Sequence, residues 1–494
     1  MSDDENGAAE EAADPFKDGV LPAILAARGQ TNEGELNALL ETLAKQYSAG
    51  NVEWGGNLTS TINQAVEKLD RIISRQLSGV MSCPEFSNLE GSWRGLQKLV
   101  RNSELGADLK MRLFDATPGE LLAQFENAPT VDRSPLFNAV YQKEYGTAGG
   151  EPYGLLLGDM TFTYRDEDVT LLRYIGEVAA ASHCPFIAAT TPAMFELPAF
   201  SALAEGRPVA AGFDDPLYGA WNAFRASDDS RYVTLTLPRV MARLPYGPDT
   251  LPVKRFNFEE LIKDDTGHVQ FDQEKDFVWT NAAYDLALNM TQAFTQFGWC
   301  TAIRGVENGG KVENLPNFTY LSDSGDRVQL CPAEVNLTDE REKEMSDLGF
   351  LPLVHYRNQS YAVFLGAQTA QKPQEYVDPD ATANAAISAR LPYVMASGRI
   401  AHYLKVIGRD RIGSNLTPED VERELTDWIC QYTNPNAIGN EARAECPLRE
   451  SKISVVEQRG RPGCYSVVAY LRPWLQMEEL TASLRTVAAI PGAS

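Results

Sequence analysis

Apolar side chains recur every three or four residues in several segments near the start of the chain, which is the pattern of amphipathic helices. The first group is the cluster Val20, Leu21, Ile24 and Leu25. A second stripe comprises Leu36, Leu39, Leu40, Leu43 and Tyr47, and a third comprises Ile62, Val66, Leu69, Ile73 and Leu77. Such helices either pack on the core of their own chain or bind a partner, and the pattern is compatible with both.

The pattern of residues 84–100 predicts a further helix, which has an apolar stripe and two glycines one turn apart. Pro84 suits the first helical position, where its missing N–H would have no partner. Its apolar stripe comprises Phe86, Leu89, Trp93, Leu96 and Val100. Gly91 and Gly95 lie one turn apart, and each costs roughly 1 kcal/mol relative to alanine inside a helix. We therefore expect another backbone to approach this helix closely, either from the core of the same chain or from a neighbouring molecule. The candidate close-packing residues are Phe86, Gly91, Trp93 and Gly95.

The middle of the chain alternates between strand and helix patterns. A strand at 153–157, expected to be buried on both faces, a helix at 167–181 and a strand at 186–189 predict a right-handed parallel crossover. Further predictions are strands at 109–113 and 232–237, a helix at 281–297, a hairpin around 323–326, and a helix capped by Thr338 and ended by Gly349. The predicted fold class is α/β, with mixed α+β character.

Prolines with polar neighbours at 372–374 and 378–380 predict a boundary. We expect an acidic tail with N-terminal helices over 1–55, a main α/β domain over 56–372 and a C-terminal domain over 380–494. The C-terminal domain contains helical patterns at 381–407 and from 417 onward, and two β-prone runs at 453–457 and 465–471. A hairpin of two strands is marginal on its own and has unpaired edges. It either completes a sheet of its own domain or shares strands with another molecule.

Composition narrows the possible partners. The 494 residues carry 44 basic and 68 acidic side chains, a net charge of −24, which opposes general affinity for nucleic acid or for an anionic membrane. The seven cysteines contain no Cys-x-x-Cys pair and indicate neither a disulfide framework nor a zinc site. No leader peptide and no run of 18 apolar residues is present, so we expect a cytoplasmic protein with reduced thiols and no membrane insertion.

Motifs for catalysis are weak. Residues 305–312 approach a phosphate-binding loop, but Val312 lacks the hydroxyl that would bind magnesium and Pro316 interrupts the required helix. The histidines, including His183, lie far apart in the sequence. Asp159 follows a predicted strand but has no partner base, so a turn or hydrogen-bonding role is favoured over catalysis. We predict no reaction, metal or cofactor.

A basic stripe stands out from this acidic background. If residues 399–409 are helical, Arg399, His402, Lys405 and Arg409 fall within one arc of the helix surface. The stripe is expected to be a solvated face, a set of ion pairs with the acids of the chain, or a contact with another subunit.

A series of short segments, in the same order along the chain, resembles one protein family. They include Pro84-Glu85-Phe86 with Trp93-Arg94-Gly95-Leu96, Leu235-Thr236-Leu237-Pro238-Arg239, Arg243-Leu244-Pro245-Tyr246-Gly247, Gly298-Trp299-Cys300-Thr301-Ala302-Ile303-Arg304-Gly305, Leu348-Gly349-Phe350-Leu351-Pro352-Leu353 and Ala401-His402-Tyr403-Leu404-Lys405. Together they are similar to the large subunit of the type VI secretion contractile sheath, the TssC family, from about residue 80 to residue 475.

This resemblance implies a tail-sheath-like fold with N-terminal helices and a C-terminal β-hairpin linker. It implies a heterodimer with a small sheath subunit, which polymerises with further copies in a helical lattice around an inner tube, on a baseplate. The implied strand-exchange residues are Ile453, Val455, Tyr465, Val467, Ala469 and Leu471. A Clp-type ATPase that disassembles contracted sheath is implied at Val20, Leu21, Ile24 and Leu25. The alternatives are a phage-like tail sheath protein and a soluble α/β enzyme.

Overall fold

The computed structural model describes residues 58–205, 208–261, 269–322, 324–414, 417–457 and 465–474, together with positions 41–42, 44–46, 49 and 476. By its internal contacts the chain forms two compact units, one of residues 1–83 with 245–270 and one of residues 84–244 with 271–494. This division differs from the predicted boundaries near 55 and 372–380. The predicted ATPase contact, Val20, Leu21, Ile24 and Leu25, lies outside the described residues.

The first unit contains helix α3 (Leu58–Met81), which the apolar spacing predicted. Polar side chains of α3 contact the segment 257–260 of the same unit. The Asp70 carboxylate accepts from the Asn257 N–H at 3.2 Å, Ser74 Oγ accepts from the Glu259 N–H at 3.3 Å, and Ser78 Oγ donates to the Glu260 carbonyl at 3.0 Å. The inward face of α3 is therefore its polar face.

The second unit is built on a six-stranded sheet with strand order β1-β2-β3-β9-β10-β6. Its strands are β1 (Leu156–Phe162), β2 (Phe186–Thr190), β3 (Val233–Leu237), β6 (Lys311–Val312), β9 (Phe350–His355) and β10 (Ala362–Phe364). The first four strands in this order run parallel, whereas β10 runs antiparallel to both β9 and β6. The sheet is therefore mixed in strand direction, and the predicted α/β fold class with α+β character is confirmed.

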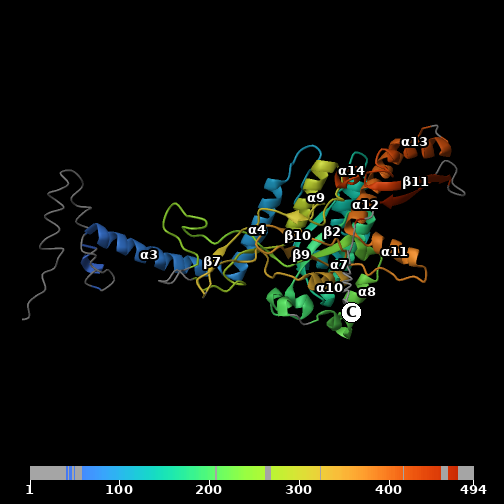
Figure 1. Cartoon of the computed structure of the whole chain (residues 1–494). Helices are drawn as coiled ribbons and strands as arrows, with labels where there is room; N and C mark the ends of the chain where they lie inside the picture. The colour runs from blue at the N-terminus through green and yellow to red at the C-terminus, as the bar shows by residue number, and fades with distance from the viewer. Residues whose placement is uncertain are drawn as a thin grey trace, which may run out of the picture. The chain divides into compact units, whose positions relative to one another are not determined.

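Helices lie beside the central sheet (Figure 1). The α- and π-helices are α4 (Pro84–Asn102), α5 (Pro118–Asn127), α6 (Pro135–Phe137), η3 (Asn138–Tyr145), α7 (Asp166–Ser182), α8 (Gly219–Arg225), α9 (Ala283–Phe297), α10 (Asp339–Asp347), α11 (Pro379–Ser388), α12 (Leu391–Asp410), α13 (Pro418–Cys430) and α14 (Asn440–Glu445). The short 3-10 helices are η2 (Val131–Arg133), η4 (Pro192–Phe195), η5 (Phe200–Glu205), η6 (Ala210–Asp214), η7 (Pro216–Tyr218) and η8 (Asp229–Tyr232). Three two-stranded sheets pair β4 (Val240–Met241) with β5 (Trp279–Thr280), β7 (Thr319–Leu321) with β8 (Arg327–Gln329), and β11 (Leu448–Glu457) with β12 (Tyr465–Pro473).

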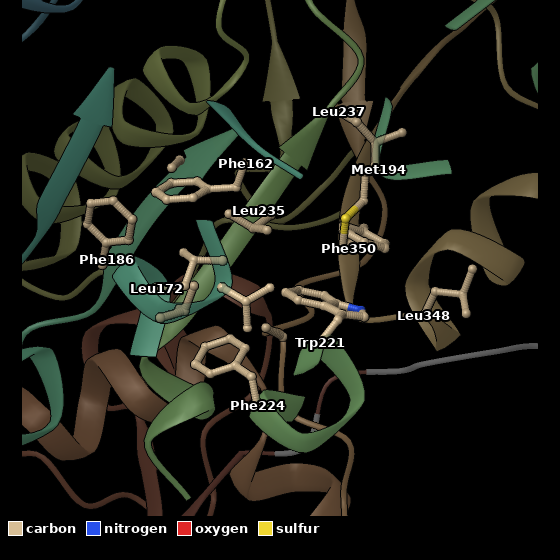
Figure 2. Close-up of a cluster of buried hydrophobic side chains, with 14 of the residues drawn as sticks. Phe162, Leu172, Phe186, Met194, Trp221, Phe224, Leu235, Leu237, Leu348 and Phe350 are labelled. Atoms are coloured by element: carbon tan, nitrogen blue, oxygen red, sulfur yellow. The ribbon is translucent and has the colours of Figure 1, made fainter. Parts of the chain in front are cut away.

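Alternating residues of the central strands pack into two different cores. Phe350 of β9 belongs to the cluster that includes Leu172 of α7 and Trp221 of α8, whereas Leu351 belongs to the cluster that includes Leu286 of α9. Figure 2 shows the first cluster, with Trp221 lying between Phe224 and Phe350. Trp221 and Phe350 stack with ring centroids 5.4 Å apart. The sheet is thus covered on both faces by helices.

Several predicted elements are confirmed and two need correction. The crossover β1-α7-β2, strand β3, helix α9, the β7–β8 hairpin and the Thr338 cap of α10 are all present. Residues 109–113 form no strand, although Met111 packs against the α9 core. The strand expected at 153–157 begins at Leu156, and it is a half-exposed edge strand rather than a strand buried on both faces. The apolar run at 153–157 did not by itself show which of these residues pair with β2.

Among the described residues, no helix is both long enough and apolar enough to cross a membrane.

Candidate assembly surfaces

Helix α4 packs on its own chain through its glycines. A Cβ added at Gly91 would lie 2.1 Å from the carbonyl oxygen of Trp279, and one at Gly95 would lie 2.4 Å from Thr280 Oγ1 and from the Tyr284 ring. The close approach that the two glycines predicted is therefore real, and the approaching backbone is that of β5 in the same chain. Of the two origins that the sequence left open, the internal one is observed.

Charged side chains also hold α4 in place. Arg243, which is 4% exposed, donates to both carboxylate oxygens of Glu90 at 2.6 and 3.1 Å, and Arg94 donates to the same carboxylate at 2.6 Å. Burial raises the pKa of Glu90, but the hydrogen bonds and charges of the two arginines outweigh it and leave that pKa below its usual value. On the next turns, Lys98 pairs with the buried Asp285 of α9 at 2.5 Å.

The opposite face of α4 is apolar and exposed. Phe86 is 43% exposed, Leu89 57%, Trp93 63% and Val100 40%. With the half-buried Leu96 these positions follow spacings of three, four, three and four, which is the a/d repeat of a helix that packs against another helix. A stripe of large apolar side chains left in water is typical of a protein–protein contact.

Helix α3 has the same inversion of faces. Its polar residues Thr61 and Ser74 are buried, whereas its large apolar residues are exposed. The exposed side chains are Ile62, Val66, Leu69, Ile72, Ile73, Leu77 and Val80. The sequence left open whether this stripe packs on the core or binds a partner. Within the described residues it is not part of the core.

The C-terminal hairpin is the third surface. β11 and β12 pair antiparallel, with Ile453 opposite Ala469 and Val455 opposite Val467. Ile453 and Val455 are buried in a small core with Leu425 and Ile429 of α13. Of the two alternatives for this hairpin, completion of a larger sheet is not observed, because no third strand pairs with it among the described residues.

The two edges of this hairpin differ. The Val455 N–H donates to the Glu422 carboxylate at 2.9 Å, so it points away from β12. Val455 and Val467 therefore form a non-hydrogen-bonded pair of the antiparallel ladder, in which both N–H groups point away from the partner strand. By the same alternation, Val467, Ala469 and Leu471 direct their backbone groups to the outer edge of β12. The helix α13 thus covers part of the β11 edge, and the β12 edge offers the row of donors and acceptors.

The predicted basic stripe on α12 is wrong as an exposed contact. His402 is 3% exposed and donates from Nε2 to the Ser182 carbonyl at 2.7 Å. The Lys405 ammonium lies 3.4 Å from the Tyr145 ring centroid, Arg409 donates to the Tyr145 and Thr147 carbonyls, and Arg399 stacks on Tyr403. The stripe faces its own chain. Its cations contact aromatic rings and backbone carbonyls there, and not the acidic side chains or the solvent that we expected.

The chemical motifs gain no catalytic geometry. Asp159 lies within β1 rather than after it and is exposed. Burial, and then Asp159 itself, raises the pKa of Tyr284. Residues 305–310 form turns that lead into strand β6, so the helix a phosphate-binding loop requires does not follow them. No group of three metal-binding side chains occurs among the described residues.

Comparisons with known proteins agree with this picture of an assembly subunit. Residues 63–371 match the family model "EvpB/VC_A0108, tail sheath N-terminal domain", and residues 380–490 match "EvpB/VC_A0108, tail sheath gpW/gp25-like domain". The chain is 42% identical over 438 residues to the type VI secretion system sheath protein TssC1 of Pseudomonas aeruginosa, covering 88% of this chain and 86% of that one.

Two solved structures have a weaker likeness. The baseplate of the anti-feeding prophage has a TM-score of 0.35 and 11% identity, covering 65% of this chain and 66% of that chain. The contracted PVC sheath complex of an extracellular contractile injection system has a TM-score of 0.36 and 10% identity, covering 64% of this chain and 67% of that chain. The two family models and the TssC1 likeness together cover most of the sequence. The chain therefore belongs to the tail sheath protein family of type VI secretion systems.

Proposed function

We propose that this chain is the large subunit of a type VI secretion contractile sheath, and that it joins its neighbours by exchange of β-strands at residues 453–471. The single observation that carries the exchange is the β11–β12 hairpin, which has only two strands and an outer β12 edge without a partner strand among the described residues. Backbone hydrogen bonds to a neighbouring strand would complete this sheet.

We further propose that the exposed apolar stripes of α3 and α4 bind the small sheath subunit. Each stripe is too apolar to remain in water, and its helical repeat suits an amphipathic helix of a second chain. The resulting heterodimers polymerise around an inner tube on a baseplate, and their contraction drives the tube outward. The exchanged strands keep neighbours connected while the subunits change their packing.

A proline at the β12 edge tests the exchange. Val467→Pro removes an N–H that points away from β11, so the hairpin keeps its internal ladder while the added strand loses a donor. We expect co-expression of this variant with a small sheath subunit to give heterodimers without long tubes in negative-stain electron microscopy. The matched control Val467→Thr keeps the N–H and should form long hollow tubes.

Two results would count against the exchange: tubes of normal length and normal contraction from Val467→Pro, or the same from a chain that lacks residues 453–471. Discrete particles from the unmodified chain with every small subunit tried would contradict the sheath assignment itself.

Disassembly by a Clp-type ATPase remains a prediction for Val20, Leu21, Ile24 and Leu25. Leu21→Asp combined with Leu25→Asp should leave assembly intact and slow the ATPase-driven breakdown of contracted sheath. An unchanged rate of breakdown would show that the ATPase binds elsewhere.

A further inference from the structure

Two histidines that lie far apart in the sequence meet where α12 crosses the end of α7. His183 ends α7 in a left-handed conformation, with φ 52°, and its ring centroid lies 6.5 Å from that of His402 on α12. The backbones are close as well, because a Cβ added at Gly398 would lie 2.6 Å from the His183 carbonyl oxygen. Gly398 therefore allows α12 to approach the end of α7 closely.

The charged side chains that act directly on the two imidazoles are those of lysine and arginine. On α12 they are Lys405 and Arg399, which act on His402, and Lys405 also acts on His183. Arg409 of α12 binds the carbonyls of 145 and 147. Tyr145 of η3 lies against the His402 ring, and Tyr141 and Tyr145 lie against the Lys405 ammonium. The Tyr232 hydroxyl of η8 lies 3.3 Å from His183 Nδ1, and Asp229, Arg231 and Tyr393 act on Tyr232. Among the described residues, no carboxylate contributes to the shift of either imidazole.

These surroundings lower the pKa of both imidazoles. The Ser182 carbonyl can only accept, so His402 carries its proton on Nε2, and its Nδ1 has no partner among the described residues. Burial lowers the pKa of His402 to about 4, with Arg399, His183 and Lys405 adding to the effect against the Ser182 hydrogen bond. Burial and Lys405 also lower the pKa of His183. Each shift stabilises the packed state above the ordinary pKa of 6.5, and this stability is lost as pH falls toward the lowered value.

We propose that the contact of His183 with His402 is an acid-sensitive joint between α12 and the sheet: in mild acid an imidazole binds a proton beside Lys405, and α12 separates from the end of α7. An extra cation there lies beside Lys405, and separation of α12 from the end of α7 exposes it to water. The protonation needs no other reactant.

The helix that carries His402 also packs against the C-terminal hairpin and its supporting helix α13. Ile400 of α12 packs in the same small core as Leu425 of α13 and Ile453 of β11. A displacement of α12 would therefore disturb the support of the hairpin. Acid would loosen the C-terminal part of the subunit and the α12 side of the α9 core, where Leu391 and Met395 pack, while the core around Trp221 remains packed.

Thiol labelling of the full chain can test this joint, because Cys184 follows His183 directly and is fully buried. A dithiodipyridine reagent, which still reacts with thiols in acid, would be applied across the pH range, and peptide mass spectrometry would give labelling of Cys184 relative to the exposed Cys430. One proton linked to opening changes the equilibrium up to about tenfold per pH unit. We expect the ratio to rise by at least about tenfold between about pH 7.5 and about pH 5.

Variants locate the proton. His402→Gln keeps a donor for the Ser182 carbonyl, and His183→Asn tolerates the left-handed backbone, so each should flatten the rise in Cys184 labelling. The control His355→Gln changes another buried histidine, on β9, whose pKa burial also lowers, and it should leave the rise unchanged.

Three outcomes would overturn the joint: no rise for Cys184 in the unmodified chain, an equal rise for the half-buried Cys331, which indicates general unfolding, or a full rise in the double variant of His183 and His402. The first two need no variant to fold. None of them bears on the assembly of tubes at neutral pH, so failure of the joint is distinguishable from failure of the proposed function.

Discussion

The central sheet and the C-terminal hairpin show two ways to stabilise β-structure. The strands β2, β3 and β9 are buried throughout and have helices on both faces, so their stability comes from within the chain. The hairpin has a small core on its α13 side, while Val468 and Tyr470 of β12 are 43% and 63% exposed. A region whose burial is incomplete is where a neighbouring chain could add stability.

Helix α4 repeats this contrast within one element. Its glycine face is fitted to β5 with no space for a methyl group, and its aromatic face is in water. A substitution on the first face should change the stability of the chain, and one on the second should change assembly. The following predictions test this separation.

The largest effect should come from the central core. Trp221→Ala removes a side chain with 0% exposure that stacks on Phe350, and we expect a loss of about 3 to 5 kcal/mol in the free energy of unfolding. The counterpart Tyr470→Ala on β12 should change it by less than about 0.5 kcal/mol. Urea denaturation of the purified chain measures both. Similar losses from the two variants would remove the distinction between the regions.

Next in size is the loss of the Glu90 carboxylate. Glu90→Gln leaves the buried Arg243 without its anion, and we expect a destabilisation of about 2 to 3 kcal/mol at neutral pH. Because the pKa of Glu90 is lowered in the folded chain, its contribution is present above pH 4.5 and disappears as pH falls toward the lower folded pKa.

The Glu90→Gln difference should therefore shrink in acid, as measured by denaturation at several pH values. Glu450→Gln, which breaks an exposed pair with Arg472 on the hairpin, is the control and should cost less than about 1 kcal/mol. A Glu90→Gln penalty that stays constant down to the lowest pH would exclude a role for the carboxylate charge.

Two glycine substitutions should have opposite signs. Gly91→Ala places a methyl group against the Trp279 carbonyl and should destabilise by about 1 to 3 kcal/mol. Gly79→Ala on α3 meets nothing within 4 Å, and the better helix propensity should stabilise by up to about 1 kcal/mol. Thermal unfolding reports both signs, and stabilisation by Gly91→Ala would show that β5 does not pack there.

The smallest effect on stability should come from the exposed stripe. Trp93→Ala should change the free energy of unfolding by less than about 0.5 kcal/mol and weaken binding of the small sheath subunit about tenfold or more. Leu217→Ala, at an exposed position on η7, is the matched control and should leave binding unchanged. Binding of the small subunit measured by titration would decide, and equal affinity for the two variants would place the partner on another surface.

Local patterns predicted the local elements well. The capping residues Thr338 and Thr417 begin α10 and α13, and the apolar spacing located α3, α4, α7 and α9. Errors arose where pairing partners decide the outcome. The alternation over 109–113 is that of a strand, but no described strand pairs with it, and so it has no ladder.

The candidate sites divide in the same way. The hairpin was predictable because its two strands lie close together in the chain. The orientation of the α12 stripe was not, because it depends on rings and carbonyls of residues 145–183, as in the contact of His402 with Ser182 over 220 positions. Spacing places residues on one face of a helix and carries no information about what that face meets.

The sequence by itself determined that α4 has a glycine face and an apolar face, that α3 is amphipathic, and that the C-terminal region contains a β-hairpin. These are properties of period and residue type, which neighbours in the chain already specify. Only the tertiary structure decided that the glycine face lies inward, that the large apolar side chains lie outward, and that His183 and His402 meet at the end of α7. Such choices depend on distant segments competing for the same surface, and burial is the outcome of that competition.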